Sequence, residues 1–144
     1  MSLKSDFPIF SNNPDLVYLD SASTAQKPRA VIDGMSRFLS HDSANIHRGA
    51  YALSERSEEL YHASKESVAR FIGASDVSEI SYTYNATHAF NMLVLSFRKS
   101  GWLKKGDKVL LSVAEHHANI VPWLIAKEEI GIEVEFVGLD AEYG

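Results

Sequence analysis

Two adjacent histidines, His116 and His117, are the residues of this chain best suited to chemistry. They lie between an apolar run that ends at Val113 and a run of helical character that includes Pro122. Ligands of α/β proteins collect where strands end and helices begin. An imidazole at such a junction could stack on a planar heteroaromatic cofactor or transfer a proton near neutral pH. A hydrogen-bonded histidine pair at a helix start explains the same pattern equally well.

A metal site at this pair is not expected. Adjacent side chains diverge by about 100° on a helix and point to opposite sides of a strand. No other histidine or acidic residue stands at the spacing of a zinc motif. The 144 residues contain no cysteine, which excludes disulfides and thiol catalysis within them.

Two further segments could take part in binding. Residues 84–88 follow a strand-like run and open a helix, whose first N–H groups suit a phosphate, with the Thr87 hydroxyl as a further donor. Capping of that helix by Asn85 or Thr87 is the simpler explanation of this segment alone. In an aperiodic stretch, His47 could transfer a proton and Arg48 could pair with a phosphate or a carboxylate, although a solvated loop is the simpler explanation of this segment alone.

The elements that would position these residues alternate in the second half of the chain. The pattern predicts strands at 79–84, 108–113 and 132–137, with a helix in each gap and Gly131 ending the second helix. This order implies right-handed crossovers and a partly parallel sheet with flanking helices. The predicted fold class is therefore α/β.

The first half is predicted to be mainly helical. A brief strand is expected at 17–20, and Pro28 suits the first turn of a helix. A second helix is expected to be capped by Ser54 and ended by Gly73.

Composition and charge limit the possible partners. The net charge is −5 and no long basic run occurs, which argues against nucleic acid. No apolar run is long enough to span a membrane, and the N-terminus does not resemble a signal peptide, so we expect a cytoplasmic protein. Residues 1–16 are expected to form an N-terminal arm. Residues 17–144 are expected to be part of a larger, apparently truncated domain, because the chain stops after a strand and leaves a parallel sheet uncovered.

Several segments occur in an order that resembles one known family. They are residues 18–28, 47–49, 53–56, 85–87, 106–107 and 115–123, of which His-His-Ala-Asn-Ile-Val-Pro-Trp at 116–123 is the most specific. Their order resembles the class V aminotransferase family of pyridoxal-phosphate enzymes. The similarity is greatest to the N-terminal part of sulfur-mobilising cysteine desulfurases and their selenocysteine lyase relatives, and it runs from about Asp6 to Leu139.

The resemblance implies roles for particular residues. It implies the N-terminal part of the large domain of a fold-type I transferase that binds pyridoxal 5'-phosphate. His116 would stack on the pyridine ring and assist proton transfers, while Thr87 and the backbone at Ala86 would hold the phosphate. The residues that would bind the substrate are Ala22, Ser23, His47 and Arg48, of which the last two could approach the site across a dimer interface.

The chain also departs from the family pattern. Tyr84, Asn85 and His88 are unusual beside the implied phosphate site, and the family's Ser-x-His-Lys segment and nucleophilic cysteine do not occur. The resemblance thus implies a fragment, inactive alone, of a homodimeric enzyme. That enzyme would convert L-cysteine to L-alanine and pass sulfur to an acceptor protein for iron–sulfur cluster assembly. The alternatives are another class V enzyme (selenocysteine lyase, kynureninase-like or epimerase) or a non-catalytic remnant that acts as a binding or dimerisation module.

Overall fold

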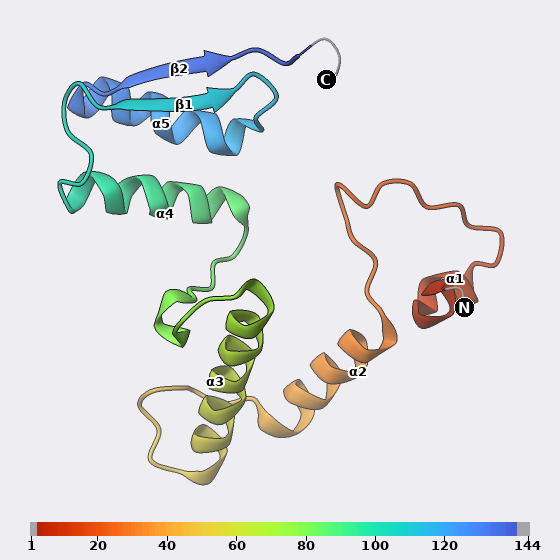
Figure 1. Cartoon of the computed structure of the whole chain (residues 1–144). Helices are drawn as coiled ribbons and strands as arrows, with labels where there is room; N and C mark the ends of the chain where they lie inside the picture. The colour runs from red at the N-terminus through yellow and green to blue at the C-terminus, as the bar shows by residue number, and fades with distance from the viewer. Residues whose placement is uncertain (1–2, 141–144) are drawn as a thin grey trace. The chain divides into compact units, whose positions relative to one another are not determined.

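The computed structural model describes residues 3–140 of the chain (Figure 1). The chain divides into two compact units, one that ends at Ile80 and one that begins at Ser81. No helix within residues 3–140 combines the length and the apolar character needed to cross a membrane.

The first unit is built from helices. The long helix α3 ends at Gly73, whose φ of 74° is the left-handed conformation that glycine adopts most easily. The predicted end of this helix is confirmed. The elements of the unit are a 3-10 helix at Leu3–Asp6, α1 (Pro8–Asn12), α2 (Arg29–Arg37), a π-helical turn at Phe38–Asp42, α3 (Ala52–Ile72) and a 3-10 helix at Val77–Glu79.

Two helix starts in this unit differ from expectation. Pro28 is the N-cap of α2, so the helix begins one residue later than predicted. Ser54 does not cap α3, because α3 already begins at Ala52 after the N-cap Tyr51. Ser54 is buried in the first turn, where its hydroxyl donates a hydrogen bond to the Asn45 carbonyl at 2.6 Å. A tertiary contact therefore uses the hydroxyl that the sequence pattern assigned to capping.

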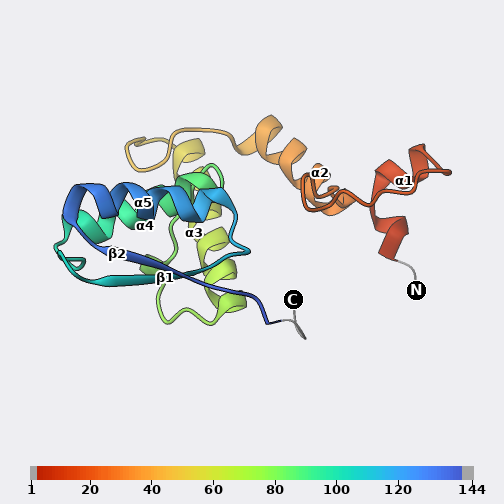
Figure 2. The ribbon, with the colours of Figure 1, turned by 90° about the horizontal axis from the view of Figure 1, so that it is seen from above.

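The second unit contains the sheet. Two parallel strands pair from Lys108 with Glu133 to Ser112 with Val137, and α5 connects them. The predicted α/β class with parallel strands is confirmed, and α5 lies along the pair in both views (Figures 1 and 2). The elements of the unit are α4 (Ala86–Lys99), β1 (Lys108–Ser112), α5 (His117–Ile130) and β2 (Glu133–Val137).

Two predicted strands do not form. Residues 17–20 and 79–84 have no strand assignment, although both contain residues typical of strands. A strand needs a partner for its backbone N–H and C=O groups. Among residues 3–140 only β1 and β2 pair with each other. The apolar pattern of residues 17–20 and 79–84 was therefore not sufficient to make them strands.

A small apolar core holds the second unit together. Its buried residues come from α4, β1, α5 and the residue just before β2, and full burial of one such aliphatic side chain contributes about 1.5–3 kcal/mol. Arg98 of α4 and Glu129 of α5 form an ion pair at the edge of this core. The core therefore fixes the two helices relative to each other. Its buried members are Val94, Leu111, Trp123, Ala126 and Ile132.

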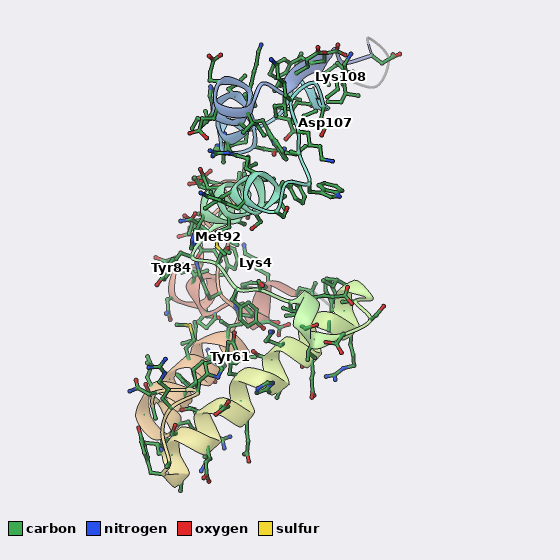
Figure 3. All side chains as sticks on the ribbon, turned by 90° about the vertical axis from the view of Figure 1, so that its left-hand side faces the viewer. Lys4, Tyr61, Tyr84, Met92, Asp107 and Lys108 are labelled. Atoms are coloured by element: carbon green, nitrogen blue, oxygen red, sulfur yellow. The ribbon has the colours of Figure 1, made fainter. Side chains whose placement is uncertain are left out.

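Charged side chains on the surface form ion pairs between the two strands. Lys108 Nζ, labelled in Figure 3, lies 2.6 Å from Glu135 Oε1 and 3.7 Å from Glu133 Oε2. The hydrogen bond and the charge of Glu135, with a smaller contribution from Glu133, raise the pKa of Lys108 above its usual value. Such cross-strand charge pairs favour the observed register.

Candidate functional site

His116 is the N-cap residue of α5. Its backbone is extended, with φ −69° and ψ 144°, and its ring Nδ1 accepts a hydrogen bond from the backbone N–H of Ala118 at 3.1 Å. When Nδ1 is the acceptor, the neutral imidazole carries its proton on Nε2. The ring is thus held in one orientation at the junction between β1 and α5, where the sequence predicted it.

The start of α4 presents backbone donors. Asn85 is the N-cap, and its Oδ1 accepts a hydrogen bond from the His88 N–H at 2.8 Å, which confirms the capping interpretation for Asn85. Among the hydrogen bonds of residues 3–140, none uses the N–H of Ala86 or of Thr87. Free donors in the first turn of a helix favour an anion. Capping and anion binding can therefore coexist at this turn.

The two helix starts meet at one cavity of about 270 Å³. Thr87 reaches it from α4 and His116 from the start of α5, so the second unit brings together two residues that the resemblance assigned to the cofactor. The role of each stays a prediction. The residues that line this cavity, called the His116 cavity below, are Thr87, Asn91, His116, His117, Ala118, Val121 and Pro122.

Both histidines of the pair border this cavity. Their ring centroids are 6.5 Å apart with an interplanar angle of 89°, and both side chains are exposed. Neither ring is packed into the protein, so the geometry alone allows either to face a planar ligand. No cluster of three or more potential metal-binding side chains is present in residues 3–140.

The unusual residues beside α4 have a local structural role. The rings of Tyr84 and His88 stack with centroids 5.5 Å apart and an interplanar angle of 16°. Together with the Asn85 cap, this contact holds the turn that leads into α4. These departures from the family pattern therefore stabilise the helix start, and neither Tyr84 nor His88 lines the His116 cavity.

Ala22 and Ser23 lie in a turn of the first unit. The Ser23 N–H donates to the Asp20 carbonyl at 3.2 Å. The Tyr18 hydroxyl contacts both ends of the turn, at 3.1 Å from the Asp20 carbonyl and 2.6 Å from that of Thr24. The turn is therefore closed by backbone and side-chain contacts, and both Ala22 and Ser23 are exposed.

His47 and Arg48 lie in the loop before α3. His47 has a φ of 72°, a conformation that costs free energy in a residue other than glycine. Its ring Nδ1 lies 3.2 Å from Glu58 Oε1, and the ring packs nearly perpendicular to that of Tyr61. Arg48 is exposed. Within residues 3–140, no hydrogen bond or ion pair joins Ala22 or Ser23 to this loop.

The loop itself is attached to α3. The Ala44 N–H donates to Ser57 Oγ at 3.0 Å, and the ion pair of Arg56 Nε with the buried Asp42 Oδ1 spans 2.7 Å. Ser57 also donates to the Asp42 carbonyl. These contacts anchor a stretch for which the sequence alone favoured a solvated loop.

A set of hydrogen bonds among residues that flank His116 in the sequence was not predicted. Asn119 Nδ2 donates to Glu115 Oε2 at 2.9 Å, and Trp123 Nε1 donates to Asn119 Oδ1 at 3.1 Å. The sequence did contain a signal, because residues four apart share one face of a helix. Glu115, Asn119 and Trp123 have this spacing.

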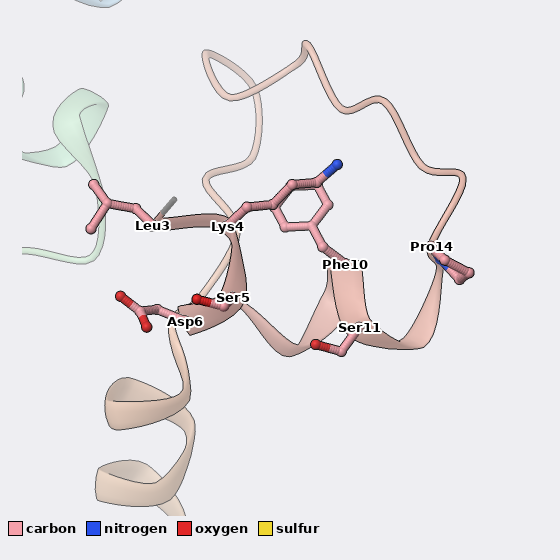
Figure 4. A pocket seen from close by; sticks show the side chains of 7 residues that line it. All are labelled: Leu3, Lys4, Ser5, Asp6, Phe10, Ser11 and Pro14. Atoms are coloured by element: carbon pink, nitrogen blue, oxygen red, sulfur yellow. The ribbon is translucent and has the colours of Figure 1, made fainter. Parts of the chain in front are cut away.

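A larger cavity lies elsewhere, at the N-terminal segment of the first unit (Figure 4). It measures about 620 Å³, and Lys4 Nζ lies 4.8 Å from the centre of the Phe10 ring beside it. None of the predicted site residues lines it. Cavity size alone therefore does not identify the site.

Comparisons with known proteins identify the family. The family model for aminotransferase class-V matches residues 17–143. A probable cysteine desulfurase of Synechocystis sp. is 43% identical over 144 residues, which covers 98% of this chain and 34% of that protein. The chain thus spans about a third of the length of this relative.

Two solved structures share the fold. The apo cysteine desulfurase of Thermococcus onnurineus superposes with a TM-score of 0.85 at 30% identity, covering 96% of this chain and 33% of that one. The cysteine desulfurase CsdA of Escherichia coli gives a TM-score of 0.77 at 37% identity, with coverage of 96% and 34%. The predicted resemblance to the N-terminal part of a cysteine desulfurase is confirmed. The chain belongs to the aminotransferase class-V family.

Proposed function

We propose that this chain is part of a pyridoxal-phosphate-dependent cysteine desulfurase that converts L-cysteine to L-alanine. The observation that carries the proposal is the meeting of Thr87 and His116 at one cavity. The similar proteins named above are cysteine desulfurases, and they are about three times as long as this chain. The activity belongs in this proposal to the whole protein.

The residues of the His116 cavity fit pyridoxal phosphate. An imidazole suits the face of a pyridine ring, and stacking of two aromatic rings contributes about 0.5–1.5 kcal/mol beyond the burial of area. The N–H groups at Ala86 and Thr87 and the Thr87 hydroxyl are donors for a phosphate at a helix N-terminus. The cavity therefore offers an aromatic face and an anion site next to each other.

The chain's own residues would hold and orient the cofactor. When bound, the cofactor withdraws electrons, so that the Cα of an amino acid can lose a proton. His116 would hold the plane of the cofactor ring. Because the Ala118 N–H occupies Nδ1, Nε2 is the nitrogen from which His116 can donate a proton.

The remaining features of the proposal concern substrate and partners. Ala22, Ser23, His47 and Arg48 would contribute to the substrate site. The whole enzyme would be a cytoplasmic homodimer that passes sulfur to an acceptor protein for iron–sulfur cluster assembly. Residues 1–16 would form an arm and residues 17–144 part of the large domain. The 144-residue chain would have no turnover by itself, since it has no cysteine to accept sulfur.

Binding of pyridoxamine 5'-phosphate tests the proposal. This amine analogue cannot condense with surface lysines, so its binding measures non-covalent affinity for the cavity. Replacement His116→Ala should weaken binding about two- to tenfold, from the stacking contribution. The matched control His62→Ala removes an exposed imidazole from α3 and should leave the affinity unchanged.

Three outcomes would each contradict part of the proposal. Equal affinities of the wild-type chain and His116→Ala would remove His116 from the site, and a loss in His117→Ala alone would transfer the role to its neighbour. Alanine or sulfide formed from L-cysteine by the purified chain, above a control with cofactor only, would contradict the predicted lack of turnover.

A further inference from the structure

We propose that Glu115, Asn119 and Trp123 position the imidazole of His116. This inference rests on the proposed role of His116, and it adds residues that do not themselves touch the cofactor. The three side chains are called the Asn119 bridge below. The bridge joins the residue before His116 to the buried part of α5.

The side chain of Asn119 uses both halves of its amide. Nδ2 donates to Glu115 Oε2 at 2.9 Å, while Oδ1 accepts from Trp123 Nε1 at 3.1 Å. An amide can donate and accept at once, and the donor-only indole fixes which end faces Trp123. The Asn119 side chain therefore satisfies both partners with one residue.

Trp123 gives the bridge a fixed end. The side chain is 7% exposed and packs in the core with Leu111 and Ala126. Its ring centroid lies 6.2 Å from that of Phe97. Because a packed core changes shape little, the indole N–H defines where the Asn119 amide lies.

The free end of the bridge holds the residue next to His116. The Glu115 N–H donates to the Ser112 carbonyl at 3.3 Å, and its carboxylate is held by Asn119. On the other side of His116, the Asn119 N–H donates to the His116 carbonyl at 2.8 Å. Contacts on both sides thus fix the backbone of His116.

A fixed backbone is what the ring contact needs. The bond from the Ala118 N–H to His116 Nδ1 is 3.1 Å long and forms only in one orientation of the ring. If Glu115 is released, the turn between β1 and α5 can rotate and this bond weakens. The bridge would thereby set both the direction of the imidazole and the nitrogen that carries its proton.

The nitrogen resonances of His116 test this inference without any cofactor. At alkaline pH, where imidazoles are neutral, a fixed Nδ1 acceptor gives two well-separated ring nitrogen signals in ¹⁵N NMR spectra. In Glu115→Ala we expect these signals to move toward each other, because the two tautomers would exchange. Glu115→Gln keeps an acceptor for Asn119 Nδ2 and should retain the wild-type separation.

A second pair of variants separates positioning from stability. Asn119→Ala should shift the same signals and also lower stability, since it leaves the Trp123 N–H without its partner. The control Asn13→Ala removes a comparable bond, from Asn13 Nδ2 to the Ile9 carbonyl at 2.9 Å, in the first unit. It should leave the His116 signals unchanged.

Unchanged His116 signals in Glu115→Ala would overturn the inference, as would equal shifts in Glu115→Ala and Glu115→Gln. The proposed function can fail separately. If His116→Ala leaves pyridoxamine phosphate binding unchanged while Glu115→Ala still shifts the His116 signals, the bridge positions the ring but the ring has another use.

Discussion

Thr87 and His116 border one cavity, although Thr87 belongs to the first turn of α4 and His116 precedes α5. The apolar core between the helices holds this arrangement. A helix start with free N–H groups and an imidazole are two features that suit a phosphorylated aromatic ligand.

The hydroxyl of Thr87 should contribute to binding the phosphate. Replacement Thr87→Val should weaken pyridoxamine 5'-phosphate binding about ten- to a hundredfold, the effect of losing one hydrogen bond to a charged group. Thr87→Ser keeps the hydroxyl and should bind nearly as well as the wild type. Pyridoxamine without phosphate should bind both variants alike, and an equal loss for both ligands would show that the hydroxyl does not contact the phosphate.

The Asn85 cap should stabilise α4. Asn85→Ala removes the acceptor of the His88 N–H and should lower the free energy of unfolding by about 1 kcal/mol. Asn85→Asp keeps an acceptor and should stay close to the wild type. Urea unfolding followed by circular dichroism measures both variants, and identical midpoints for the alanine and aspartate variants would contradict the assignment.

Asp76 should make the stability of the chain depend on pH in the acid range. Hydrogen bonds from the side chain and the backbone N–H of Ser78 lower the pKa of Asp76 below its usual value. A lowered native pKa contributes stability above the unfolded pKa of about 3.9, and this contribution is lost as the pH falls through the native value.

Asp76→Asn should therefore destabilise the chain most at pH 5 and above, with a difference from the wild type that shrinks toward about pH 2. Urea midpoints measured across this range test the prediction. Asp33→Asn removes an exposed carboxylate from α2 and controls for the loss of charge alone. A difference that stays constant with pH would contradict the role of the Asp76 carboxylate.

Gly49 should be required for the packing of the loop before α3, which contains His47. A Cβ at this position would overlap the side chain of Ser54 and approach the ring of Tyr51. Gly49→Ala should lower stability by about 1–3 kcal/mol and increase proteolytic cleavage in the loop.

Gly34→Ala is the matched control, because nothing lies within 4 Å of a Cβ at Gly34 in α2. This change should be neutral or stabilise by up to about 1 kcal/mol, from the higher helix propensity of alanine. If Gly49→Ala were as stable and as resistant to protease as Gly34→Ala, the close packing of Gly49 on Ser54 would be wrong.

The sequence by itself determined the features that depend on neighbouring residues. Gly73 and Gly131 end helices because their left-handed conformation favours glycine, and Asn85 caps α4 through a contact three residues away. The junction of β1 with α5 was also predicted, since an apolar strand pattern changes there to a helical one. The resemblance of residues 116–123 to a known family pointed to the cofactor.

Only the tertiary structure decided the features that join distant residues. Serine is a residue type that often caps helices, but the Ser54 hydroxyl donates to the Asn45 carbonyl instead. Residues 79–84 form no strand because a strand requires a partner strand. Packing of α4 against α5 brought Thr87 to the same cavity as His116. Local patterns specify conformation within a few residues, whereas burial and pairing depend on which segments meet in space.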